Sequence, residues 1–318
     1  MSAFTPVPSR ERVIVREVGL RDGLQIEKRP VSTRDKLAVL DLLLDAGVRH
    51  LQVTSFVSPR AVPQLADAEE VVAAMPRVEG MHSCALVPNA RGATRAAATR
   101  VDAIEIVVSC SDTHNRKNLN RSIARSLEEA VEVARIARDA GKRFEVGFAT
   151  VFGCPFEGEV DPARVGAMAG RMAELGASHV GLGDTTGMAV PPTVRAALRE
   201  VRANAPGVAI GLHFHNTRGV GLACVMVGLE EGIRHFDASI GGLGGCPFAP
   251  GATGNVCTED LVYLLEESGY STGIDLDRLV LAARRMQAIL GRELPGQVMK
   301  AGPRLRRYGD TAVPTAAG

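Results

Sequence analysis

The chain of 318 residues contains no tryptophan, and aromatic residues make up only 4% of it. Proteins that hold single-stranded nucleic acid stack the bases on aromatic side chains, and few such side chains are present here. The formal net charge is +1, so charge attracts neither a phosphate backbone nor an anionic membrane surface. We therefore expect no nucleic-acid partner and no membrane partner.

Secretion signals and paired cysteine motifs are also lacking. Residues 1–18 contain no apolar core of a signal peptide, and the longest strongly apolar stretch, residues 221–229, is far shorter than a membrane span. No C-x-x-C pair occurs among the six cysteines, which stand at positions 84, 110, 154, 224, 246 and 257. We expect a cytoplasmic protein whose thiols stay reduced.

The sequence does contain a regular alternation of short β-rich segments and longer amphipathic ones. The segments typical of strands cover residues 13–18, 50–55, 82–87, 104–108, 144–151, 179–184, 209–215 and 235–240. Apolar residues at helical spacing lie between them, for example at 36–48, 68–75, 122–141 and 164–176. This α/β alternation predicts a parallel sheet, and eight units favour a (β/α)8 TIM barrel. The dinucleotide-binding alternative lacks its G-x-G-x-x-G signature.

The domain organisation follows from the same pattern. A flexible N-terminal arm is expected at residues 1–12, and a TIM-barrel catalytic domain at 13–257. Two further helical patterns predict a C-terminal helical appendage over 258–300 that packs on the barrel. Residues 301–318 are expected to form a tail. We expect the protein to be a homo-oligomer, either a dimer or a tetramer.

Two histidines stand two positions apart in the stretch GLHFHNTRG, residues 211–219. Residues i and i+2 of a strand share a face, so His213 and His215 aim two imidazoles at one point. A metal ion explains such a pair. Two independently hydrogen-bonded histidines at a strand end explain it equally well.

Barrel enzymes carry their chemistry at the carboxyl ends of the strands, and polar residues gather there in this sequence. They are Arg21, Asp22, Gln25, Glu27 and Lys28 after the first strand, Gln52, Thr54 and Ser55 on the second, Asp184 and Thr185 after the sixth, and Cys246 and Asn255 in a glycine-rich loop after the eighth. Together with the two histidines, they offer a carboxylate, two imidazoles and an amide oxygen. That set suits Mg²⁺ or Mn²⁺, and it is compatible with Zn²⁺ or Co²⁺.

Several segments carry long and specific motifs between about residue 13 and residue 275. They are EVGLRDGLQIEK, VTSFVSPRAVPQLADAEEV, RKNLN, GCPFEGEVDP, GLGDTTG, HFHNT and GGLGGCPFAPGATGNVCTEDLVYLL. Together they resemble the 3-hydroxy-3-methylglutaryl-CoA lyase family and, more distantly, the isopropylmalate and homocitrate synthases. The resemblance implies a TIM barrel that binds a divalent cation and cleaves its acyl-CoA substrate into acetyl-CoA and acetoacetate.

Carried over to this sequence, the resemblance implies a role for each matching residue. The implied metal ligands are Asp22, His213, His215 and Asn255. The implied catalytic residues are Arg21, which steadies the thioester enolate, Cys246 on the mobile glycine loop, and Asp184. The residues expected to contact the substrate are Gln25, Lys28, Gln52, Thr54 and Thr185.

Elementary chemistry agrees with these implied roles. Cleaving a carbon–carbon bond beta to a thioester requires that a hydroxyl lose its proton and that the departing enolate be stabilised and then protonated. A divalent ion lowers the pKa of a hydroxyl that it holds, and an arginine at the thioester oxygen stabilises the developing charge. A thiol such as Cys246 can deliver the proton, because its pKa of about 8.5 can be tuned toward neutrality.

Three positions depart from the family pattern. The lyases carry Glu where this chain has Gln52, Asp where it has Asn216, and commonly Asn where it has Ile26. An amide can orient a neighbour but cannot take a proton, so Gln52 is compatible with a different substrate, such as citramalyl-CoA or a longer branched 3-hydroxyacyl-CoA. A non-catalytic acyl-CoA-binding barrel is the competing class. Retention of all four implied metal ligands favours the enzyme.

Overall fold

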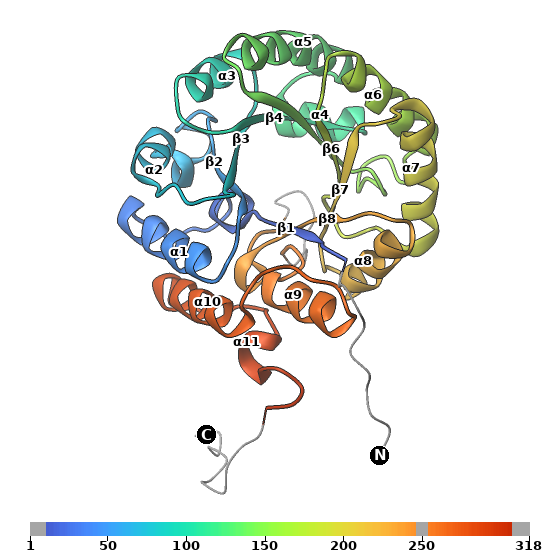
Figure 1. The fold of residues 1–318 in the computed structure, drawn as a ribbon. Coiled ribbons are helices and arrows are strands. Elements are labelled where there is room, and N and C mark those ends of the chain that lie inside the picture. Colours follow the sequence, from blue (N-terminus) through green and yellow to red (C-terminus); the bar gives the residue numbers. More distant parts are fainter. Residues whose placement is uncertain (1–10, 246–253, 307–318) are drawn as a thin grey trace, which may run out of the picture.

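The structure is a computed structural model that describes residues 11–245 and 254–306. Its parallel strands pair in the order β1 to β8 and form a closed barrel, because β8 pairs with both β7 and β1. Figure 1 shows the ring of strands enclosed by helices. The predicted TIM barrel is confirmed.

The bounds of the elements lie close to the predicted ones. The strands are β1 (Ile14–Glu17), β2 (His50–Ser55), β3 (His82–Val87), β4 (Ala103–Ser109), β5 (Arg143–Ala149), β6 (His179–Asp184), β7 (Ala209–Phe214) and β8 (His235–Ala238). The helices are α1 (Thr33–Asp45), α2 (Ala68–Ala74), α3 (Ala90–Ala97), α4 (Asp112–Leu119), α5 (Ile123–Asp139), α6 (Pro162–Glu174), α7 (Pro191–Asn204), α8 (Gly221–Glu230), α9 (Thr258–Glu267), α10 (Leu276–Leu290) and α11 (Val298–Ala301). Short helical turns are η1 (Gly19–Gly23), η2 (Pro63–Leu65) and η3 (Ile240–Gly242).

The helices begin where the sequence offers capping side chains. Ser32, Ser122 and Asp275 each accept a hydrogen bond from the backbone N–H three residues later, which starts α1, α5 and α10. Gly47 follows the end of α1 with a φ of 96°, a left-handed conformation that favours glycine. No helix in the described part of the chain is long and apolar enough to cross a membrane.

The segment after β8 continues as helices on one side of the barrel. α10 packs against α1, and α11 packs against α9 (Figure 1). The hydroxyl of Thr258, at the start of α9, donates to the carboxylate of Glu17 at the end of β1 at 2.6 Å. These helices occupy the range predicted for the C-terminal appendage, whereas residues 1–10 and 307–318 of the expected arm and tail lie outside the described residues.

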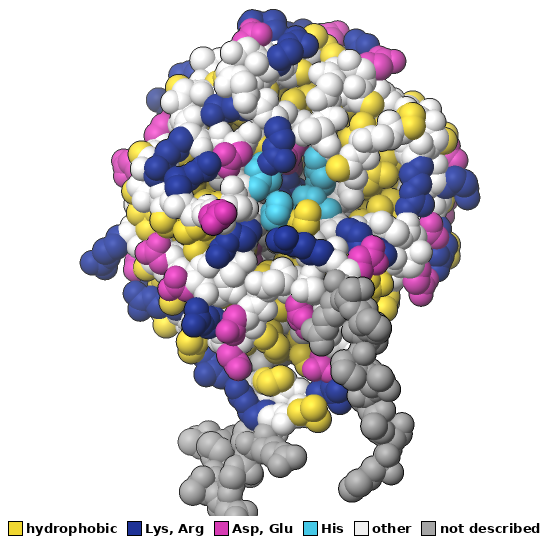
Figure 2. Space-filling model, in the orientation of Figure 1, with side chains coloured by type: hydrophobic (Ala, Val, Ile, Leu, Met, Phe, Trp, Pro, Cys, Tyr) yellow, Lys and Arg dark blue, Asp and Glu magenta, His cyan; other side chains and the backbone are white. Residues whose placement is uncertain are grey.

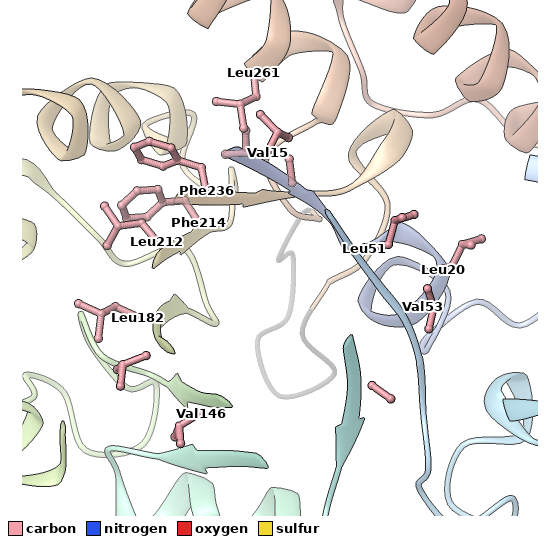
Figure 3. Packing of buried hydrophobic residues seen from close by; sticks show 14 of the residues in the cluster. Val15, Leu20, Leu51, Val53, Val146, Leu182, Leu212, Phe214, Phe236 and Leu261 are labelled. Carbon is pink, nitrogen blue, oxygen red and sulfur yellow. The ribbon is translucent and has the colours of Figure 1, made fainter. Parts of the chain in front are cut away.

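The strands are largely apolar on the outside of the barrel and carry several charged and polar side chains on the inside. Figure 3 shows labelled outer residues, such as Leu51, Leu212 and Phe236, between the strands and the helices. The residues that alternate with them include Gln52 and Asp237, and both are buried. TIM barrels are usually filled by branched apolar side chains, so a polar interior is a particular property of this chain.

Four strands begin with a histidine, and these histidines lie together at the amino-terminal mouth of the barrel. The ring centroids of His179 and His235 are 4.4 Å apart, and those of His50 and His82 are 5.6 Å apart. Figure 2 shows histidine side chains gathered at the centre of the face in view. Burial lowers the pKa of His50 to about 4 and lowers the pKa of His179 as well.

These buried neutral histidines predict a loss of stability in mild acid. Below pH 6.5, the ordinary histidine pKa, the unfolded chain binds protons that the folded chain does not, and for His50 this continues down to about pH 4. For a group as buried as His179, the free energy of unfolding falls by up to about 1.4 kcal/mol per pH unit once the pH is below the ordinary histidine pKa. Urea unfolding at about pH 7.5 and pH 5 measures the loss. The His179→Asn variant should lose less, and an equal loss would contradict this explanation.

Candidate active site

A cavity of about 580 Å³ opens at the carboxyl ends of the strands. Its lining includes Arg21 and Asp22 from η1, His213 on β7 and His215 just after that strand, and Glu105 from the interior face of β4. Residues far apart in the sequence therefore meet at the mouth where TIM barrels place their chemistry.

The Arg-Asp-Gly segment after β1 forms a single π-helical turn, η1, and not an open surface turn. The backbone N–H of Gly23 donates to the carbonyl of Val18, five residues earlier, at 3.3 Å, and the N–H of Asp22 donates to the same carbonyl at 2.8 Å. The buried carboxylate of Glu17 accepts hydrogen bonds from the backbone of Gly19 at 2.6 Å and of Ile240 at 2.9 Å. η1 is thereby tied to the loop after β8. π-Helical turns recur at functional sites because they redirect side chains.

Three of the four implied metal ligands converge, and the fourth lies beside them. The Asp22 carboxylate oxygen Oδ2 is 3.9 Å from Nε2 of His213 and 3.9 Å from Nε2 of His215. The amide nitrogen of Asn255 donates to the same carboxylate oxygen at 2.7 Å, while its Oδ1 is buried without a hydrogen-bond partner in the described chain. An unpartnered amide oxygen beside a carboxylate and two imidazoles fits a divalent cation.

The charge states of these groups suit the same ion. Burial acts to raise the pKa of Asp22, but Arg21 and the two histidines outweigh it and hold that pKa at about 2. Burial lowers the pKa of His215 to about 4. Near neutral pH the set therefore offers an ionised carboxylate and a neutral imidazole, which are the forms that bind metals.

Residues 11–245 and 254–306 contain a second group that could hold a metal ion, formed by Cys84, Glu105 and Glu145. A guanidinium already occupies it, because Nη1 of Arg16 lies 2.6 Å from Glu105 and 3.2 Å from Glu145. A cation there would have to displace this guanidinium. The Asp22 group is therefore the better metal site.

Sequence reasoning missed Asp237 and Arg16, which line the same cavity. Nδ1 of His213 lies 3.1 Å from the Asp237 carboxylate, which leaves Nε2 of His213 free to face Asp22. Burial acts to lower the pKa of His213, and the hydrogen bond to Asp237 reverses this and raises it. The guanidinium of Arg16 holds both oxygens of Asp237 at 2.8 Å. A carboxylate that orients a ligating histidine is a common feature of metal sites.

Arg21 bridges two of the predicted positions. Its Nε donates to the side-chain oxygen of Gln52, and its Nη1 donates to Asp22. Gln25 adds a hydrogen bond to the same carboxylate at 2.9 Å. The Nε2 of Gln52 is buried without a hydrogen-bond partner in the described chain.

The remaining predicted residues are more scattered. Thr185 lines the cavity, and its hydroxyl accepts a hydrogen bond from the backbone of Thr150 at 2.9 Å. Asp184 and Thr54 are buried but do not line the cavity, and Lys28 is exposed away from it. Asp184 accepts hydrogen bonds from the backbone N–H groups of residues 188 and 189, and burial raises its pKa to about 6. Cys246 lies outside the described residues.

The comparisons with known proteins agree with this geometry. A family model described as HMGL-like matches residues 12–286. The chain belongs to the HMGL-like family.

Named relatives and solved structures of this family match nearly the whole chain. The chain is 43% identical to the (R)-citramalyl-CoA lyase of Chloroflexus aurantiacus, over 92% of this chain and 96% of that protein. It is 40% identical to the hydroxymethylglutaryl-CoA lyase YngG of Bacillus subtilis, over 92% and 97%. An HMG-CoA lyase structure from Acinetobacter baumannii, in complex with coenzyme A and 3-methylmalate, superposes with a TM-score of 0.90 at 41% identity and covers 97% of this chain and 99% of that chain.

The cation site of this HMGL-like protein predicts a graded loss of metal affinity. His213→Ala removes an implied ligand and should abolish most Mn²⁺ binding. Asp237→Asn keeps all four implied ligands and removes the negative charge beside His213 and Arg16, so it should weaken binding by only about 10- to 100-fold. Titration calorimetry with Mn²⁺ measures both, with circular dichroism as the control for folding. Full affinity in a folded His213→Ala variant would place the metal elsewhere.

Proposed function

We propose that this protein is a divalent-metal-dependent lyase that cleaves 3-hydroxy-3-methylglutaryl-CoA to acetyl-CoA and acetoacetate. The observation that carries the proposal is the convergence of Asp22, His213 and His215 beside the buried, unpartnered oxygen of Asn255. Mg²⁺ and Mn²⁺ are the proposed cations, because the set contains two oxygen ligands and no thiolate. When bound, such a cation supplies Lewis acidity toward the oxygens of the acyl group.

The protein side chains account for the rest of the chemistry. Arg21 lines the cavity, and its contacts with Gln52 and Asp22 fix its guanidinium at the mouth. There it can stabilise the negative charge that develops on the thioester oxygen as the carbon–carbon bond breaks. We propose Cys246 as the group that protonates the departing enolate, as its family position implies, and Asp184 as a further substrate-contacting carboxylate.

One specific position, Gln52, bears on an alternative substrate, citramalyl-CoA. Gln52 holds Arg21 through an amide, so the guanidinium has one carboxylate partner, Asp22, where a glutamate at position 52 would give it two. The 43% identity to a citramalyl-CoA lyase supports the same alternative. The cytoplasmic location and the homo-oligomeric state stay predictions.

The proposed function predicts that purified protein with Mg²⁺ or Mn²⁺ releases acetyl-CoA from 3-hydroxy-3-methylglutaryl-CoA. Chelation of the metal should abolish the reaction, and its re-addition should restore it. Acetyl-CoA release from a panel that includes citramalyl-CoA and a longer branched 3-hydroxyacyl-CoA measures preference. Cleavage of no member of the panel would leave a non-catalytic acyl-CoA-binding barrel as the better description.

Gln52→Glu separates the two substrates. If the amide is selective for another acyl group, the variant should gain preference for 3-hydroxy-3-methylglutaryl-CoA by roughly five- to a hundred-fold in kcat/KM, since a mismatched buried polar partner costs ~1–3 kcal/mol. If Gln52 only holds Arg21, the preference should stay nearly unchanged, and this is the result we expect. Competition between the two substrates in one reaction measures the ratio directly.

A further inference from the structure

The interior of the barrel is layered, and one layer forms the floor of the active-site cavity. In a TIM barrel the side chains of alternate strands share a layer. The register pairs Gln52 of β2 with Cys84 of β3, and Cys84 in turn with Ala103 of β4. Glu105 is the next position along β4 that faces the interior. Gln52, Glu105 and Asp237 therefore lie at one level. The contacts that the Arg16 guanidinium makes with both Glu105 and Asp237 support this placement.

The two oxygens of Glu105 have different surroundings. Oε2 accepts a hydrogen bond from Nη1 of Arg16 at 2.6 Å and lies 3.9 Å from the Cys84 sulfur. Oε1 has no hydrogen-bond partner among the described residues, although Glu105 is only 3% exposed and lines the cavity. A Cβ at Gly147 would lie 2.8 Å from this oxygen, so the glycine leaves the space beside it open.

The charge of this floor restricts which part of a substrate can face it. Arg16 contacts three carboxylates, those of Glu105, Glu145 and Asp237, so the cluster carries an excess of negative charge. A substrate carboxylate would be repelled from it, and a carbonyl oxygen would find no donor on Oε1. The acyl groups considered above carry a thioester oxygen, a terminal carboxylate and a hydroxyl, and the hydroxyl is the hydrogen-bond donor among them.

We propose that Oε1 of Glu105 accepts a hydrogen bond from the hydroxyl of the 3-hydroxyacyl group. The inference rests on the proposed function and deepens it. It orients the substrate, with the hydroxyl pointing down the barrel axis and the terminal carboxylate directed away from the floor. Hydrogen bonds to charged groups are stronger than those between neutral groups when their geometry is good.

Glu105→Gln tests this contact because Arg16 controls which way the new amide turns. Nη1 of Arg16 requires an acceptor, so the amide oxygen should face Arg16 and the amide nitrogen should face the cavity. The cavity floor then presents a hydrogen-bond donor where the wild type presents an acceptor. We expect kcat/KM for the preferred 3-hydroxyacyl-CoA to fall by about 10- to 100-fold. The dissociation constant of 3-methylglutaryl-CoA, which lacks the hydroxyl and cannot be cleaved, should change less than about threefold in calorimetry.

Glu145→Gln is the matched control. Glu145 contacts the same Nη1 of Arg16 at 3.2 Å, and its other oxygen lies 3.2 Å from Nε2 of His82, but it does not line the cavity. Its variant should keep kcat/KM within about threefold. An equal fall in Glu145→Gln would show that the effect runs through Arg16 and would overturn the proposal. So would unchanged kcat/KM in Glu105→Gln, or an equal weakening of 3-methylglutaryl-CoA binding.

The wild-type protein separates this inference from the proposed function. If it cleaves no 3-hydroxyacyl-CoA, the proposed function fails, and the hydroxyl contact is still measured by binding alone. Wild type should then bind 3-hydroxy-3-methylglutaryl-CoA more tightly than 3-methylglutaryl-CoA, and Glu105→Gln should remove that difference. Equal binding of the two compounds by the wild type would overturn the contact.

Discussion

The structure depends on one buried cation, the guanidinium of Arg16 in the middle of the barrel. A buried charge is costly unless it is paired and fully hydrogen-bonded. Arg16 meets this condition through Asp237, which it holds by two nitrogens, and through Glu105 and Glu145. The carboxylates raise the pKa of Arg16 against the opposing effect of burial, and the guanidinium in turn keeps Asp237 ionised. Four strands, β1, β4, β5 and β8, are joined through this single group.

The active site is arranged above that cluster. Asp237 faces Arg16 on one side and His213 on the other, so the ion pair in the barrel also fixes the ring that is expected to bind the metal. Glycines at the inner positions 147, 181 and 183 of β5 and β6 line the cavity. The larger side chains that usually fill the core of a TIM barrel would occupy this space. The charged layer and the glycines thus leave open space under the cation site.

Much of this arrangement was predictable from the sequence, and the reasons are physical. The alternation of short β-rich segments with longer amphipathic ones predicted the strands within a few residues, because strands and helices differ in length and in the spacing of apolar residues. His213 and His215 were predictable because their spacing alone places them on one face of a strand.

Arg16 and Glu105 were not predictable, because a charged residue within a short strand usually indicates a solvent-facing position. Their partners are set by closure of the barrel, which brings together residues 89 positions apart. The π-helical turn that orients Asp22 depends on the hydrogen bond between Glu17 and Ile240, which are 223 positions apart. The local sequence therefore does not indicate this turn.

The central claim is that Asp22, His213, His215 and Asn255 hold a divalent cation above the Arg16 cluster. A crystal structure of the protein with Mn²⁺ and 3-methylglutaryl-CoA, with anomalous diffraction to locate the ion, tests it most directly. The account predicts one anomalous peak within about 2.0–2.4 Å of the Asp22 carboxylate, the two Nε2 atoms and the oxygen of Asn255. It also predicts that Arg16 keeps its contacts with Asp237 and Glu105. A peak between Glu105 and Glu145 with Arg16 displaced, or His213 turned away from Asp22, would contradict it.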